Sequence, residues 1–211
     1  LAWLRHRGTE PADRTVPWGV IEPELKRLVD LSYLWHMPSS NEEPVFLGWT
    51  RPMVTPGRRY AGTRLRNAFH ACNSDLKRFL LSEGCQRLKQ VATWLESTLL
   101  TALRSQGYVG YMGVDAFVYE DQKQAFKIKP LVELNPRMTM GHLALGLEKR
   151  LAPGAEGEFR ILTRPQWQAE RESLMSRTVE LTPSGHLKSG FLPLGDFQDE
   201  TKLFPVLIVG Q

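Results

Sequence analysis

The residues best suited to chemistry are oxygen-bearing side chains inside two apolar stretches. Asp115 stands in the run GVDAFV, and Glu133 and Asn135 lie two residues apart in VELN. Side chains alternate between the two faces of a strand, so Glu133 and Asn135 share one face. Carboxylate and amide oxygens suit a hard cation such as Mg²⁺. The pattern predicts a metal site if the two stretches are neighbouring strands, whereas scattered acids at a sheet rim remain the alternative from composition alone.

A basic residue follows the amide. Arg137 lies two residues beyond Asn135, and a guanidinium can bind a phosphate or carboxylate through two hydrogen bonds. Two carboxylates and one amide do not complete an octahedral shell, so we expect phosphate oxygens and water to supply the other ligands.

A hairpin is expected to position these residues. Apolar and alternating residues predict strands over 108–120 and 125–135, joined by a turn at 121–124. An antiparallel pairing of these strands would bring Asp115 close to Glu133.

Further strands are expected upstream. Alternation predicts one over 28–37, and a second follows at 45–55, where Pro52 indicates an edge strand or a bulge. The Gly-containing segment 56–64 is predicted to be a turn closing that strand.

Helices should flank this sheet. Leucines, alanines and valines at helical spacing predict a long helix over 83–105. A shorter helix is expected near 72–82, capped by Asn73 or Ser74, and another over 138–151.

These elements predict an α+β fold, mainly an antiparallel sheet with flanking helices, plus a small β-rich section at the C-terminus. The expected division is an N-terminal segment (1–16), a main unit (17–152) and an accessory β-rich section (153–211).

Composition narrows the classes of function. The 211 residues carry a formal net charge of +4 with no long basic run, which does not require nucleic acid as a partner. Cys72 and Cys85 lie in no CxxC or Cys/His cluster, so reduced thiols in a cytoplasmic protein are expected, although a disulfide stays open. No apolar run approaches the roughly 18 residues that span a bilayer, and the N-terminus lacks a signal-peptide pattern.

The string GYVGYMGVDAFVYE followed by LVELNPRMTMGH resembles the ATP-grasp superfamily. The resemblance implies an ATP-grasp-like fold in which Asp115, Glu133 and Asn135 bind one or two Mg²⁺ ions, with Mn²⁺ as a substitute. Arg137 is then the catalytic contact to a phosphate or acyl phosphate.

A second match lies upstream, in GVIEP (19–23). It resembles the family's adenine-binding hinge, which implies that Ile21, Glu22 and Pro23 contact the adenine edge of ATP. Asp30 matches the acid that binds the ribose hydroxyls. The alternative for Glu22 and Asp30 is a surface acid near a turn.

By this resemblance the chain is the ATP- and Mg²⁺-binding part of a ligase that joins a carboxylate to an amine or thiol through an acyl phosphate. Nothing before residue 18 matches the family's upstream lobe, with its Lys and Gly-rich loop. The chain is therefore expected to be either a fragment that lacks its N-terminal lobe or a divergent member, and a non-catalytic nucleotide-binding or interaction module is the alternative function. A homo-oligomer is a further open alternative.

Two other features remain open in the sequence. His142 could touch substrate or could cap and pack a helix. Arg58, Arg59, Arg64 and Arg66 could guide an anion, although a solvated loop fits them better.

Overall fold

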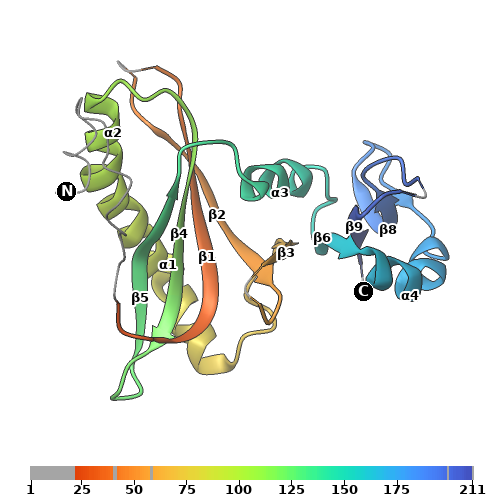
Figure 1. Cartoon of the computed structure of the whole chain (residues 1–211), viewed down its shortest axis with the longest axis horizontal. Coiled ribbons are helices and arrows are strands. Elements are labelled where there is room, and N and C mark those ends of the chain that lie inside the picture. The colour runs from red at the N-terminus through yellow and green to blue at the C-terminus, as the bar shows by residue number, and fades with distance from the viewer. Residues whose placement is uncertain (1–21, 40–41, 58, 199, 211) are drawn as a thin grey trace, which may run out of the picture.

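A computed structural model describes residues 22–39, 42–57, 59–198 and 200–210. Its strands form one nine-stranded sheet in the order β5-β4-β1-β2-β3-β6-β9-β8-β7, and every neighbouring pair is antiparallel (Figure 1). The strands are β1 (Lys26–Met37), β2 (Val45–Val54), β3 (Tyr60–Leu65), β4 (Gly110–Glu120), β5 (Phe126–Asn135), β6 (Gly157–Thr163), β7 (Glu180–Leu181), β8 (Leu187–Pro193) and β9 (Leu203–Val209).

A helical rod covers one face of β1, β4 and β5 (Figure 1). It consists of α1 (Ser74–Leu95), a π-helical segment (Glu96–Leu100) and α2 (Thr101–Ser105). Asn73 caps α1, because its Oδ1 accepts a hydrogen bond from the Leu76 main-chain N–H at 2.8 Å. The rod is interrupted at residues 82–85, where Glu83, Gly84 and Cys85 have left-handed backbone angles.

The core under this rod follows from strand alternation. Every second residue of β1 from Leu31 to Met37 is apolar and at most 1% exposed, and these side chains pack with Leu80, Leu88 and Leu95 of α1. Burial of these large side chains is the main source of stability for this half of the molecule.

The opposite face carries α3 (Met140–Glu148) beside the polar residues described below. A Cβ added at Gly141 would lie 3.0 Å from Leu34 Cδ1 and from Thr50 Oγ1. The missing side chain therefore allows α3 to approach β1 and β2 closely. The fourth helix, α4 (Arg164–Met175), packs on the C-terminal strands through Trp167 and Leu174.

The expected fold class, α+β with a mainly antiparallel sheet and flanking helices, is confirmed. The hairpin of β4 and β5 is confirmed as well, since their register pairs Asp115 with Glu133. The two helices expected at 72–82 and 83–105 form the interrupted rod. The division of the chain at residues 152 and 153 stays a prediction, although β6 hydrogen-bonds directly to β3.

Some expectations were wrong. Residues 56–64 do not form only a turn, because β3 begins at Tyr60. This strand places β2 inside the sheet, so the edge expected at Pro52 is wrong. The alternative, a bulge, agrees with the register shift between Met53 and Val54. The helix expected over 138–151 is shorter, and α4 and β8 were not anticipated. No helix in the described part of the chain is long and apolar enough to cross a membrane.

Candidate metal and nucleotide site

Polar side chains line the face of β1, β4 and β5 that points away from α1. Directly opposed residues of antiparallel strands share one face, so the registers place a set of side chains together. We call this set the polar face: Asp30, Ser32, Asp115, Phe117, Lys129, Glu133 and Asn135.

The centre of the polar face is a row across three strands. Asp115 of β4 lies directly opposite Ser32 of β1 on one side and Glu133 of β5 on the other. Asn135, only 8% exposed, donates from Nδ2 to Asp115 Oδ2 at 3.2 Å. The structure thus brings the three predicted metal ligands to one point of the sheet.

Arg137 joins this cluster from the loop after β5. Its Nη2 donates to Asn135 Oδ1 at 3.1 Å, while the rest of the exposed side chain reaches solvent. The positive charge of the guanidinium therefore lies close to any anion that binds at the cluster.

The electrostatics of the cluster favour a bound cation. Burial raises the pKa of Asp115 above its ordinary value of 3.8, and the charge of Glu133 adds to this rise, while hydrogen bonds from Ser32 and Asn135 oppose it. Like charges placed directly opposite in a sheet are destabilising. A divalent cation would remove that repulsion, so the residues fit the ion that the sequence suggests.

The donor set is mixed rather than purely acidic. Within the described residues, no group of three or more His, Cys, Asp or Glu side chains could hold a metal. Asp115 and Glu133 therefore need the Asn135 amide oxygen, and hard oxygen donors of this kind suit Mg²⁺ better than a softer metal.

Asp30 lies on the same face, two residues before Ser32 in β1. It is an ion-pair partner of Arg27, whose guanidinium also sits 4.5 Å from the centre of the Phe117 ring. A ribose contact at Asp30, as the sequence suggests, would compete with this ion pair. The flat Phe117 ring and the guanidinium above it form the part of the face nearest to Asp30.

The other predicted nucleotide contacts are more peripheral. Glu22 is exposed and pairs with Lys129 Nζ at 2.6 Å, which ties the start of the described chain to β5. Pro23 is exposed and lies before β1, and Ile21 lies outside the described residues.

His142 has a clear structural role. Its Nδ1 accepts from the Thr139 main-chain N–H at 3.1 Å, and its Nε2 faces the Trp35 carbonyl at 3.4 Å. These bonds close a capping box at the start of α3. Burial lowers the pKa of His142 from its ordinary 6.5, which keeps the ring neutral as this arrangement requires.

Sequence reasoning missed several members of the polar face. The alternation of β1 places Ser32 on the face of Asp30, so its contact with Asp115 had a signal. Phe117 had the same signal, because it lies two residues after Asp115 in β4. The neighbours of Lys129 and Arg27 could not be predicted, because they depend on the register shifts in β5 and β1.

No protein-family model and no curated protein matches the chain. Solved structures of ATP-grasp enzymes are similar to it in fold. N5-carboxyaminoimidazole synthetase from Staphylococcus aureus, also solved with ADP, has a TM-score of 0.45 and 10 to 11% identity over 89 to 90% of this chain and 47 to 48% of its own. Biotin carboxylase from Campylobacter jejuni has a TM-score of 0.44 and 12% identity over 90% of this chain and 43% of its own.

A third structure is the biotin carboxylase domain of the Hydrogenobacter thermophilus 2-oxoglutarate carboxylase, solved with MgADP and bicarbonate. Its TM-score is 0.43, with 9% identity over 86% of this chain and 41% of its own. The chain thus spans less than half the length of each of these proteins. At TM-scores below 0.5 and such low identity, the similarity carries no conclusion about activity.

Proposed function

We propose that the polar face binds Mg²⁺ together with ATP, and that the chain is the metal- and nucleotide-binding part of an ATP-grasp ligase joining a carboxylate to an amine or thiol. The observation behind this proposal is the direct opposition of Asp115 and Glu133, with Asn135 bonded to Asp115. Two facing carboxylates in a sheet repel each other, a bound cation would relieve this repulsion, and the mixed oxygen donors suit Mg²⁺.

The residues of the cluster have distinct tasks in this proposal. Asp115, Glu133 and Asn135 would hold the ion, which when bound neutralises phosphate charge. Asn135 is bonded on both sides, to Asp115 and to Arg137, so it orients both neighbours. The Arg137 guanidinium would bind and orient a phosphate or acyl phosphate oxygen by charge-assisted hydrogen bonds.

The test is binding of nucleotide with and without metal. ATP with Mg²⁺ should raise the melting temperature, whereas ATP with EDTA should have a much smaller effect, because the phosphates then lack their main protein link. Asp115→Asn keeps the size and hydrogen-bonding shape but removes a charged ligand, and it should abolish the Mg²⁺-dependent part of the shift.

The matched control is Glu180→Gln, which also neutralises an acid but lies exposed on β7. It should leave the shift intact. If Asp115→Asn retains the full Mg²⁺-dependent shift, the metal assignment is wrong.

A second candidate is a nucleotide-binding module without catalysis. ADP formation by this chain, with a panel of small carboxylic acids and an amine acceptor, supports the ligase. Binding of MgATP with no ADP formation supports the module.

A further inference from the structure

The guanidinium group of Arg27 lies on the polar face, next to the cluster of Asp115. Arg27 is opposite Tyr119 in the register of β1 and β4, and its Cζ lies 4.5 Å from the centre of the Phe117 ring. Phe117 comes two residues after Asp115 on the same face of β4. Burial raises the pKa of Asp115, whereas the Arg27 charge lowers it. The guanidinium is therefore close enough to the cluster to act on it electrostatically.

Two contacts hold the Arg27 guanidinium and leave its outer end available. Nε donates to Asp30 Oδ1, and the flat group lies over the Phe117 ring. The terminal nitrogens, Nη1 and Nη2, make no hydrogen bond with any residue that the structure describes, and the side chain is 27% exposed. Guanidinium N–H groups match phosphate oxygens in geometry and charge. Asp30 thus fixes Arg27 in a position where its terminal N–H groups can bind an anion.

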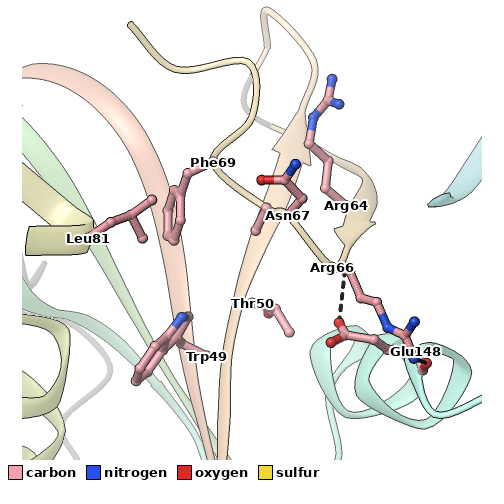
Figure 2. Close-up of a pocket in the computed structure, with 9 residues that line it drawn as sticks. Trp49, Thr50, Arg64, Arg66, Asn67, Phe69, Leu81 and Glu148 are labelled. Carbon is pink, nitrogen blue, oxygen red and sulfur yellow. Dashed lines mark hydrogen bonds between the residues drawn. The ribbon is translucent and has the colours of Figure 1, made fainter. Parts of the chain in front are cut away.

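Arg66 shows the opposite use of a guanidinium. It borders a cavity of about 260 Å³ beside β2 and β3, next to Glu148 (Figure 2). Both of its terminal nitrogens donate to main-chain carbonyls, including those of Leu151 and Ala152. The terminal N–H groups of Arg66 therefore stabilise the fold, whereas those of Arg27 have no such task among the described residues.

A second guanidinium flanks the cluster on its other side. Arg137 Nη2 donates to Asn135 Oδ1 at 3.1 Å, and Asn135 lies opposite Gly113, two residues before Asp115 in β4. Phe117, beneath the Arg27 guanidinium, lies two residues after Asp115. The two guanidinium groups are thus anchored four residues apart along β4, which corresponds to roughly 13 Å, with Asp115 midway between the anchors.

We propose that Arg27 and Arg137 bind the two ends of a linear phosphate chain, and that Asp30 positions Arg27 for this task. The inference rests on the proposed function, in which the metal at Asp115 holds the middle of the chain. It gives Asp30 a different role from the ribose contact that the family resemblance implies. A phosphate oxygen must approach a guanidinium nitrogen to about 2.7–2.9 Å, so a single phosphate does not reach both groups. The spacing therefore favours a triphosphate.

Three probes test this assignment by calorimetry in the presence of Mg²⁺: ATP, inorganic tripolyphosphate, which lacks ribose and base, and orthophosphate. Tripolyphosphate should bind saturably and at least about tenfold more tightly than orthophosphate. Equal binding of the two inorganic ions, or no saturation by tripolyphosphate up to roughly 10 mM, would overturn the proposal.

Arg27→Met keeps an apolar stem beside Phe117 but removes the guanidinium. It should weaken the binding of tripolyphosphate and ATP by the same factor, about tenfold or more. The matched control is Arg87→Met, because the Arg87 guanidinium also lies over a ring, 4.7 Å from the centre of Phe79, but belongs to α1. It should leave both affinities unchanged. Melting temperatures check that both variants are folded, and an unchanged tripolyphosphate affinity in Arg27→Met contradicts the assignment.

Asp30→Asn separates the positioning role from a ribose contact. It should change the affinities for ATP and tripolyphosphate by the same factor, because Asp30 acts on the phosphate chain through Arg27. In the Arg27→Met background this change should largely disappear, since residues that act through one another are not additive. A loss confined to ATP would show that Asp30 binds ribose, and an equal effect with and without the Arg27 guanidinium would also refute the positioning role.

The metal assignment can fail separately from this one. Tripolyphosphate binding that needs Arg27 but is indifferent to Mg²⁺ and to Asp115→Asn supports the role of Arg27 and contradicts the metal site. A Mg²⁺-dependent ATP shift that Arg27→Met leaves intact supports the metal site and contradicts the role of Arg27.

Discussion

The same three strands, β1, β4 and β5, form both faces of this part of the sheet, but the two faces differ in polarity and exposure. The face under α1 is apolar and closed, with Tyr33, Trp35 and Val114 fully buried. The polar face opposes two carboxylates, Asp115 and Glu133, and leaves Glu133 exposed. Strand alternation alone sets this division, because consecutive residues point to opposite sides.

Under the proposed function, stability and binding are divided between the two faces. The closed face gains free energy from burial of apolar surface. The polar face loses some through like-charge opposition and burial of Asp115, a loss that a bound cation would reverse. Substitutions on the two faces should therefore have opposite consequences in the metal-free protein.

The largest effect is expected from the closed face. Trp35→Ala removes a fully buried indole and should lower the free energy of unfolding by about 3–5 kcal/mol. Urea denaturation measures this. Ser32→Ala, on the same strand but on the polar face, is the matched comparison, and a loss as large as that of Trp35→Ala would refute the division between the faces.

A smaller effect of opposite sign is expected at Asp115. Its pKa is raised in the folded protein, so the stability it contributes is greatest below about pH 3.8 and is lost as pH rises through the folded pKa. Without metal, Asp115→Asn should be more stable than wild type near pH 7, by about 0.2–1 kcal/mol. This advantage should shrink toward acid pH in urea titrations. An advantage that does not vary with pH would show that the Asp115 charge is not its cause.

His142 should give a pH dependence of the other sign. Its folded pKa is lowered by burial, so its contribution is complete above pH 6.5 and is lost as pH falls from there through the folded pKa. His142→Gln keeps an acceptor for the α3 cap and should remove this loss, which we expect to be under about 1 kcal/mol. Melting temperatures of both proteins between pH 5 and 8 measure it, and identical slopes would contradict it.

The smallest effect is expected for the ion pair between Glu22 and Lys129. The Glu22 side chain is 56% exposed, and pairs of this kind contribute roughly 0.5 kcal/mol. Lys129→Met should therefore change the free energy of unfolding very little. A loss comparable to that of a core substitution would mean that the polar face also has a major part in stability.

Much of the candidate site was predictable from sequence. The shared face of Glu133 and Asn135 follows from the two-residue period, and the apolar run around Asp115 indicated its strand. Their direct opposition did not follow, because a register shift after Asp115 sets which residues of β5 it meets. Pro130 lies in the shifted segment of β5 and is a local signal of an irregularity. It does not give the size of the shift, which decides which side chains of the two strands meet.

The elements that were missed divide into two kinds. A signal for α4 was present, since Thr163 and Gln166 form a capping box at its start. No local signal was present for β3. Its segment, YAGTRL, has a small residue at Gly62, where an added Cβ would lie 2.2 Å from the Phe159 carbonyl oxygen. This strand forms because β2 and β6 lie on either side of it, which is a tertiary effect.

The Arg66 guanidinium has a mechanical consequence. It fastens the last turn of α3 and the chain just beyond it to the end of β3, through carbonyls such as those of Leu151 and Ala152. The first turn of α3 comes a few residues after Arg137 and is locked by His142. Both ends of this short helix are therefore fixed by hydrogen bonds, and the loop that holds Arg137 lies between β5 and the fixed first turn of α3.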